Sequence, residues 1–283
     1  MVGMHDNATS DFLETLKQKR PGLLLKTFHE QLYESASSLD NRVWERPLAS
    51  GSVLVAPQVE HLLKGTTILA AVYKDGVIIA GDRQATEGFQ VGERRIQKVY
   101  EVDTYSAIAI AGVAGPCIEM AKLFQVQVEF YEKIEGTMLS LEGKANYLAN
   151  MVRQNLGMAL QGLIVIPIFA GYDFKRKRGR IFKYDLAGGR YEEDDYYAIG
   201  SGGKDARSSL KKLYRSDMSR DELLNAVTEA LWDAADEDLG TGGPDLLREI
   251  YPTIKVIDQT GVSNVPDSEI KTLYIELFEK LKQ

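Results

Sequence analysis

The tripeptide Gly65-Thr66-Thr67 lies where a loosely patterned N-terminal stretch meets an apolar, β-branched segment. A threonine hydroxyl is a weak nucleophile unless a base lies beside it. A threonine at the start of a chain supplies that base itself, because its α-amine has a pKa of about 7.7–8.0. Cleavage between Gly65 and Thr66 would therefore create an activated nucleophile. For this tripeptide alone, a strand that merely begins with two threonines is the better interpretation.

A second pair of residues could tune such a nucleophile. Gly81-Asp82-Arg83 follows one expected strand, and Lys98 begins another. A buried lysine paired with an aspartate stays charged, and its positive potential lowers the pKa values of a neighbouring amine and hydroxyl. Taken singly, a surface lysine and a Gly-Asp turn are the simpler interpretations.

Three glycine-containing segments follow predicted strands or helices. Residues 111–115 leave a strand and enter a helix, so a backbone N–H there could stabilise an oxyanion; a tightly packed turn fits equally well. The segment Gly200-Ser201-Gly202-Gly203 lacks the spacing and the histidine of a nucleophile elbow, so Ser201 is interpreted as a supporting hydroxyl or helix N-cap. Asp238 and residues 241–245 form a loop after a helix, where a simple helix stop and turn would also fit.

Histidine usage excludes several kinds of chemistry. His5, His29 and His61 all precede Gly65, so the later part of the chain can hold neither a Ser–His or Cys–His pair nor a histidine zinc site. The single cysteine, Cys117, cannot form an internal disulfide, which fits a reducing compartment.

Composition adds further limits. The chain has 283 residues, of which 44% are hydrophobic and 27% charged, as in an ordinary globular protein. The net charge of −7 argues against nucleic acid as a partner. The apolar runs 108–114 and 163–170 are too short to span a membrane, and residues 1–11 carry no signal-peptide pattern, so a cytoplasmic protein is expected.

Residues 1–65 differ from the rest of the chain in the pattern of their apolar residues. Apolar residues near 12–16 suggest a short helix, 26–37 a weak helical stretch, and 46–52 a linker. This segment has too few periodic apolar positions for its own core, so a loose N-terminal extension is the simple interpretation.

From Gly65 onward the pattern alternates between hairpin strands and pairs of helices. Strands are expected at residues 66–72, 77–80, 98–102, 106–111, 163–172, 179–185, 196–199, 253–258 and 262–265. Helices are expected at residues 116–134, 141–161, 204–214, 220–237 and 267–282. This order predicts an α+β fold, a four-layer αββα sandwich of two antiparallel sheets between helix layers. Pro167 fits its expected strand poorly. The charge run 175–178 is interpreted as a solvated hairpin tip, and the charge run 192–195 as a solvated loop.

Together and in this order, the motifs resemble the β subunits of proteasomes over residues 65 to about 270. The matching segments are Gly65-Thr66-Thr67-Ile68, Ala80-Gly81-Asp82-Arg83, Gln97-Lys98-Val99, Ile110-Ala111-Gly112, residues 198–202 and residues 241–245. Residues 131–136, 161–163 and 170–173 are similar to the actinobacterial-type branch. The resemblance implies an N-terminal-nucleophile hydrolase fold, which agrees with the expected element order.

The resemblance also implies residue roles. Residues 1–65 would be a propeptide removed by self-cleavage, and Thr66 the nucleophile of a catalytic domain at 66–283. Asp82 would position Lys98, and Lys98 would tune Thr66. The Gly112 N–H would stabilise the oxyanion. The remaining implied positions are Ser201, Asp238 and Thr241 for support of the amine, Thr86 and Ala114 for the substrate backbone, and Ala85, Ile96, Ile110 and Ala114, with Tyr100, for an apolar side pocket.

The implied assembly is a threonine endopeptidase enclosed in a barrel. Heptameric rings of this chain would stack between rings of proteasome α subunits (α7β7β7α7), fed by a regulatory ring ATPase with proteins marked by a small ubiquitin-like tag. No metal or organic cofactor is implied.

The sequence departs from the family pattern at a few supporting positions. Gln84 stands where many members carry arginine, and Leu239-Gly240 replaces a small polar pair. Residues 81–86 and 200–203 are also similar to the HslV peptidase, which is shorter. Two further alternatives are a ring subunit that does not cut, against which the intact Thr66, Asp82 and Lys98 argue, and a small-molecule amidohydrolase of the same broad fold.

Overall fold

The computed structural model describes residues 65–87 and 90–282. One five-stranded sheet has the order β10-β1-β2-β11-β12, and all its pairings are antiparallel. Its strands are β1 (Thr67–Tyr73), β2 (Gly76–Gly81), β10 (Tyr196–Gly200), β11 (Thr253–Asp258) and β12 (Gly261–Asn264). The turn Lys74-Asp75 joins β1 to β2, as the turn signal predicts.

The second sheet is also antiparallel and follows the sequence order, β5-β6-β7-β8-β9. Its strands are β5 (Val99–Asp103), β6 (Ser106–Gly112), β7 (Val165–Asp173), β8 (Arg178–Tyr184) and β9 (Arg190–Glu193). A short hairpin of β3 (Ala85–Glu87) and β4 (Gln90–Glu93) pairs separately from both sheets.

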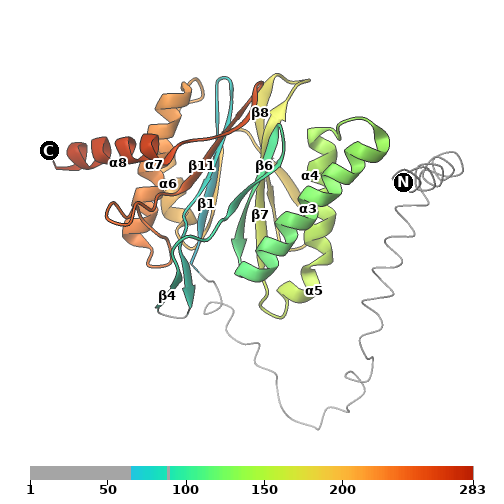
Figure 1. Ribbon diagram of the computed structural model, residues 1–283, viewed down its shortest axis with the longest axis horizontal. Helices are drawn as coiled ribbons and strands as arrows, with labels where there is room; N and C mark the ends of the chain where they lie inside the picture. Colours follow the sequence, from blue (N-terminus) through green and yellow to red (C-terminus); the bar gives the residue numbers. More distant parts are fainter. Residues whose placement is uncertain (1–64, 88–89, 283) are drawn as a thin grey trace, which may run out of the picture. The chain divides into compact units, whose positions relative to one another are not determined.

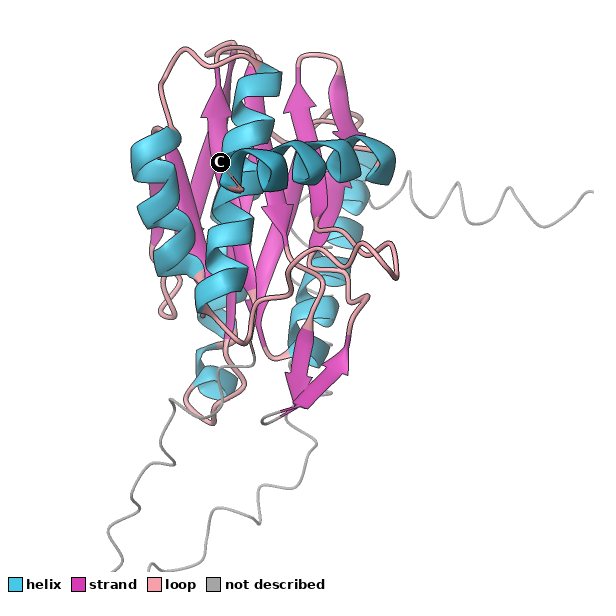
Figure 2. Cartoon of the chain, turned by 90° about the vertical axis from the view of Figure 1, so that its left-hand side faces the viewer, coloured by secondary structure: helices cyan, strands magenta, loops and turns pink. Residues whose placement is uncertain are grey.

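Helices cover the outer face of each sheet (Figure 1). The first sheet carries α6 (Gly203–Leu213) and α7 (Arg220–Glu237), and α8 (Asp267–Leu281) packs on α7. Figure 2 shows this layer from outside. The second sheet carries α3 (Ala114–Glu135) and α4 (Leu141–Gln154), followed by the short α5 (Leu156–Ala159). The predicted four-layer αββα sandwich is therefore confirmed. No helix of the described part is long and apolar enough to cross a bilayer.

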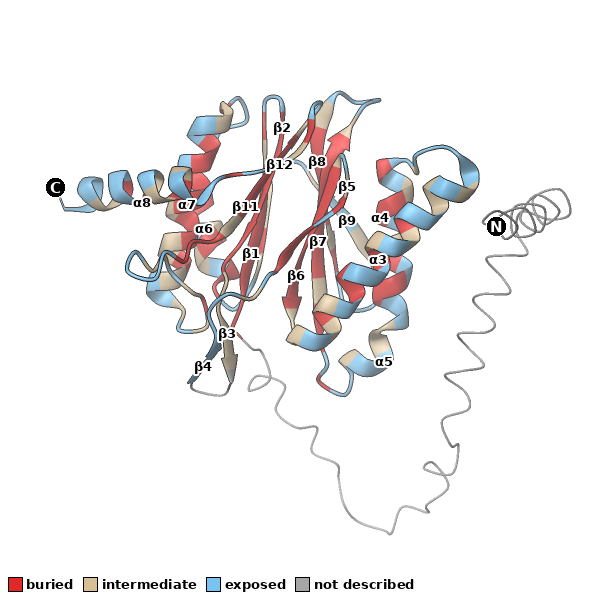
Figure 3. Cartoon of the chain, viewed as in Figure 1, coloured by how far each residue is buried: buried red, intermediate tan, exposed pale blue. Residues whose placement is uncertain are grey.

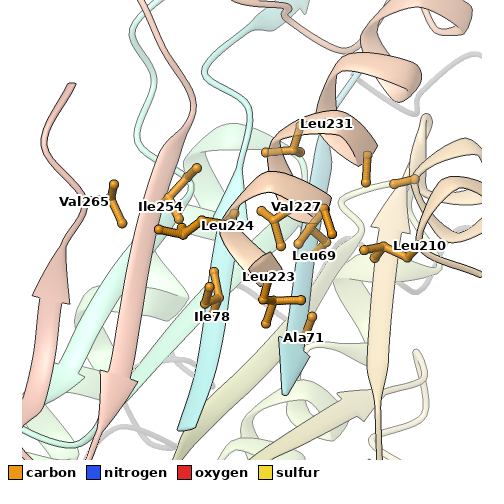
Figure 4. Packing of buried hydrophobic residues seen from close by; sticks show 14 of the residues in the cluster. Leu69, Ala71, Ile78, Leu210, Leu223, Leu224, Val227, Leu231, Ile254 and Val265 are labelled. Atoms are coloured by element: carbon orange, nitrogen blue, oxygen red, sulfur yellow. The ribbon is translucent and has the colours of Figure 1, made fainter. Parts of the chain in front are cut away.

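Three apolar layers hold the sandwich together. Both faces of the central strands are buried, and α3, α4, α6 and α7 each bury the side that faces its sheet (Figure 3). Between the first sheet and α7, Leu223, Val227 and Leu231 pack at helical spacing against Leu69 and Ile78 (Figure 4). Burying apolar side chains of this size contributes roughly 1.5–3 kcal/mol each. The layers thus make a rigid frame for the loops at the sheet ends.

Some expectations for the fold are wrong. The helix expected at 141–161 is divided into α4, which ends at Gln154, and α5, which begins at Leu156. At Asn155 between them ψ is −3°, outside the range of a regular α-helix. The run 192–195 is not simply a solvated loop, because its first two residues belong to β9. Strands β3 and β4 were not expected either, since their sequences show no apolar alternation.

Pro167 lies within β7, opposite Ile110 of β6. The pairing of β7 with β8 begins only at Ile168. At Pro167 the strand therefore has a partner on one side only, a position that tolerates a missing N–H. The helices expected at 12–16 and 26–37 lie outside the described residues.

Candidate active site

Thr66 lies immediately before β1, beside the end of β10, and is only 4% exposed. Its carbonyl accepts the Ser201 N–H at 2.9 Å, and Thr67 pairs with Gly200. Gly200 has φ +109°, and a Cβ there would collide with the Thr66 carbonyl. Glycine at this position therefore lets the β10–α6 turn approach the threonine backbone closely.

Asp82 and Lys98 form a buried ion pair next to this strand end. Lys98 Nζ lies 2.6 Å from Asp82 Oδ1, and the two side chains are 5% and 1% exposed. The same carboxylate accepts backbone N–H groups from Thr67 at 2.8 Å, Gln84 at 2.9 Å and Gly242 at 3.0 Å. A buried carboxylate is tolerated when its oxygens are satisfied in this way. Asp82 thereby fixes both Lys98 and the start of β1.

Burial lowers the pKa of the Lys98 ammonium below its usual value, although the neighbouring Asp82 carboxylate acts in the opposite direction. The cause is the loss of solvation of a charged amine that has a single carboxylate partner. As the ion-pair partner of Asp82, Lys98 places a positive charge in the wall of the pocket that Thr66 also lines. Such a charge favours a neutral amine and an ionised hydroxyl nearby.

A second network reaches the backbone nitrogen of Thr66. That nitrogen donates to Ser201 Oγ at 3.2 Å, and Ser201 Oγ lies 2.5 Å from Asp238 Oδ2. Asp238 follows α7, and its Oδ1 accepts the Gly240 N–H at 3.1 Å. Thr241 lies one step further from Thr66, because its hydroxyl bonds to Asp238 Oδ2 at 2.5 Å and lies 2.7 Å from the Thr67 hydroxyl.

Gly65 and Thr66 both line a small pocket between the end of β6 and the start of α3. Every residue that the sequence assigns to the side pocket contributes to it, namely Ala85, Ile96, Tyr100, Ile110 and Ala114. Lys98 and Gly112 line it as well. Gly112 has φ +136°, and a Cβ there would meet the backbone of Ile164. The Gly65 N–H donates to Thr86 Oγ1 at 3.0 Å, which brings the β3 hairpin to the same place.

The pocket has lining residues that the sequence analysis did not assign. They are Gln97, Cys117 and Ile118. Cys117 and Ile118 lie three and four positions after Ala114, so they share one face of the helix with it. Helical spacing from Ala114 could therefore have identified both. Burial raises the pKa of the Cys117 thiol to about 12, with Lys98 opposing.

The two departures from the family pattern contact each other. Gln84 Nε2 donates to the Leu239 carbonyl at 3.0 Å. The Leu239 side chain itself points into solvent and is 98% exposed. Gln84 thus ties the loop after β2 to the loop that carries Asp238 and Thr241.

This arrangement has the groups to activate a hydroxyl and stabilise an oxyanion. Among residues 65–87 and 90–282, no three acidic, histidine or cysteine side chains lie close enough together to hold a metal ion. Two antiparallel sheets between helix layers, with these groups gathered at a threonine that immediately precedes a strand, define an N-terminal-nucleophile hydrolase fold.

Comparison with known proteins narrows this class. The family model for the proteasome subunit matches residues 62–246. A proteasome subunit beta of Acidimicrobium ferrooxidans is 51% identical over 234 residues, which cover 83% of this chain and 85% of the relative. A proteasome subunit beta of Streptomyces griseus is 51% identical over 216 residues, covering 76% and 77%. The chain therefore belongs to the proteasome subunit family, and the predicted resemblance to its actinobacterial β-type branch is confirmed.

Proposed function

We propose that this chain is the proteolytic β subunit of a proteasome core particle, and that Thr66 becomes its nucleophile when the chain cuts its own Gly65–Thr66 bond. One observation carries the proposal. The Thr66 nitrogen, which cleavage would turn into an α-amine, is hydrogen-bonded to Ser201, while Lys98 and Gly112 line the pocket that holds Gly65 and Thr66. A base, a cation and a backbone donor would thus surround one hydroxyl.

Self-cleavage needs only groups of this chain and water. The Thr66 hydroxyl oxygen would bond to the Gly65 carbonyl carbon, the C–N bond would break, and the nitrogen would take the hydroxyl proton. Water would then hydrolyse the resulting ester, releasing residues 1–65 and a free N-terminal threonine. Gly65 suits this step because a Cβ there would collide with the backbone of Gly240.

After release, the α-amine would take the proton of the Thr66 hydroxyl as it attacks a peptide carbonyl. Lys98 would favour the ionised oxygen, and the Gly112 N–H would stabilise the oxyanion. Thr86 and Ala114 would bind the substrate backbone as a strand partner does. Because the pocket lining is mostly apolar, peptides with an apolar residue before the cut bond are the expected substrates.

The proposed context is a closed particle. Heptameric rings of this chain would stack between rings of α subunits and receive unfolded proteins from a ring ATPase. Enclosure fits the chemistry, because a peptidase of low specificity must be separated from other proteins. Withholding the amine until the propeptide leaves would delay activity until assembly.

The test is the intact mass of the particle assembled with a co-expressed α subunit, for wild type, Thr66→Ala and Thr272→Ala. Thr272 lies on the exposed side of α8, where its hydroxyl donates to the Ser268 carbonyl, so its variant serves as the matched control. We expect wild type and Thr272→Ala to lose residues 1–65 and to hydrolyse peptides, and Thr66→Ala to retain the extension.

Different results would refute parts of the proposal. If the extension stays on every variant in a complete particle, the chain is a structural ring subunit. If every variant loses residues 1–65, another protease removes them. Assembly into an active particle without any α subunit would favour an HslV-like peptidase.

A further inference from the structure

Thr67, the residue after the proposed nucleophile, is fully buried, and the proposed function gives it no role. Its backbone N–H donates to Asp82 Oδ1 at 2.8 Å, and its carbonyl accepts the Asp82 N–H at 3.0 Å. Its hydroxyl instead lies 2.7 Å from Thr241 Oγ1. Thr67 therefore joins the Asp82–Lys98 pair, through its backbone, to the Asp238 network, through its side chain.

The available donors and acceptors fix the direction of this network. Thr241 has one hydroxyl proton and donates it to Asp238 Oδ2 at 2.5 Å, because a carboxylate can only accept. The contact between the two threonines must then be donated by Thr67. Ser201 likewise donates to Asp238 Oδ2, which leaves its oxygen free to accept from the Thr66 nitrogen. An ordered path runs from Thr67 through Thr241, Asp238 and Ser201 to Thr66.

Gly202 closes over the contact between the two threonines. A Cβ at Gly202 would lie 2.6 Å from Thr67 Oγ1 and 2.7 Å from Thr241 Oγ1. Thr241 is itself only 4% exposed. In so enclosed a place, Thr241 has no ready substitute for the proton that Thr67 donates. Hydrogen bonds in such surroundings also polarise one another more strongly than they do in water.

We infer that Thr67 is a positioning residue whose hydroxyl, acting through Thr241 and Asp238, holds the α-amine of Thr66 in the neutral form that can accept a proton. This inference rests on the proposed function. Donation from Thr67 strengthens the Thr241 bond to Asp238 and so withdraws negative charge from that carboxylate. A less negative Asp238 stabilises a protonated amine less, which keeps the amine available as a base.

The experiment compares kcat and KM across pH for processed wild-type particle and for Thr67→Val, which keeps the shape of the side chain and removes its hydroxyl. We expect kcat/KM to fall up to about tenfold, the factor that one ordinary hydrogen bond represents, mainly through kcat. We also expect the acidic limb of the profile to move to higher pH, because a more negative Asp238 raises the amine pKa. Thr67→Ser should restore both values.

Thr228→Val is the matched control. Thr228 is also buried, at 1% exposed, but its hydroxyl has no hydrogen-bond partner among the described residues. Its replacement should leave the profile unchanged. A Thr67→Val profile identical to that of wild type would overturn the inference while the proposed function stands.

Two further results remain decisive. If Thr67→Val gives no processed particle, Thr67→Ser is compared with Thr67→Ala, since both lose the methyl group and only serine keeps the hydroxyl. If the pH profiles of Thr67→Ser and Thr67→Ala coincide, the inference is overturned. If the acidic limb moves to higher pH in Thr67→Ala alone, the inference is supported. If wild type never loses residues 1–65, the proposed function fails and this inference fails with it.

Discussion

Two buried cations, Lys98 and Arg180, lie near opposite ends of the second sheet and are paired in different ways. Lys98 precedes β5 near the end where Gly112 pairs with Val165, whereas Arg180 of β8 lies near the end where Ser106 pairs with Gly171. Lys98 contacts one carboxylate, that of Asp82. Arg180, 2% exposed, contacts three, namely Glu192 at 2.6 Å, Asp173 at 2.8 Å and Glu142 at 3.4 Å.

The pKa directions follow from this difference. Burial lowers the pKa of Lys98, because one carboxylate does not offset the lost solvation. The hydrogen bonds that Arg180 donates to Glu192 are the largest cause that raises the pKa of Arg180, and its three carboxylate partners together more than offset the lost solvation. Lys98, with one carboxylate partner, can still act on a neighbouring group. Arg180, with three carboxylate partners, holds those partners together instead. Burial of charge alone therefore does not mark a functional site; the balance of its partners does.

The largest expected effect is on catalysis, from Lys98→Met. This variant removes the charge while Asp82 keeps its three backbone N–H donors, so the chain should fold. We expect peptide hydrolysis to fall by about 10²–10⁴-fold, the range for loss of a group that assists proton transfer. Turnover of an apolar fluorogenic peptide by the assembled particle measures it. Near wild-type turnover would contradict the role given to Lys98.

Arg180→Met should affect stability instead. Removing Arg180 leaves Asp173 without its cationic partner and leaves Glu192 with only the more exposed Arg176 and Arg178. Loss of one partner from a buried ion cluster costs about 3–5 kcal/mol of unfolding free energy. Urea unfolding of the unprocessed chain measures this value. Turnover per assembled particle should not change. Arg215→Met, which removes an exposed ion pair with Glu222, is the control and should alter stability little.

The same cluster predicts a dependence of stability on acid. Hydrogen bonds from Arg180 lower the pKa of the Glu192 carboxyl below its usual 4.5. A carboxylate with a depressed pKa contributes stability above its unfolded pKa, and this contribution is lost as the pH falls through the folded value. Between pH 6 and pH 3, the urea midpoint of wild type should therefore fall more steeply than that of Arg180→Met. Parallel curves would show that Arg180 and Glu192 are not coupled.

Much of the fold follows from local pattern. The hairpin of β1 and β2 is predicted by β-branched residues on both sides of Lys74-Asp75-Gly76, and α7 by apolar residues at helical spacing. The structure adds a capping box at the start of α7, in which Ser219 and Glu222 bond to each other's backbone. The short polar strands β3, β4 and β9 could not be predicted this way. Their pairing depends on residues that only folding brings next to them. Glu192 of β9, for example, forms an ion pair with Arg180 on the adjacent strand β8.

The site shows the same division. Motif order predicts Thr66, Asp82 and Lys98 as site residues, because the family pattern is contiguous in each segment. The bond from Gln84 to Leu239 joins residues 155 apart, and the contact between Thr67 and Thr241 joins residues 174 apart. No local signal encodes such an approach, since it is made by sheet register and by glycines that let backbones come together. The role inferred for Thr67 is therefore visible only in three dimensions.

The smallest expected effect concerns Cys117, the only cysteine of the chain, which lines the pocket beside Lys98. Burial raises its pKa to about 12, and Lys98 opposes this rise without reversing it. At pH 8 roughly 10⁻⁴ of the thiol would be ionised, so alkylation by iodoacetamide should be far slower in the particle than in denatured chain. Lys98→Met should not speed it. Rapid alkylation that disappears in Lys98→Met would mean that the charge of Lys98 lowers the pKa of Cys117 by more than burial raises it. Lys98 and Arg180 would then differ in their number of carboxylate partners but would both stabilise a neighbouring anion.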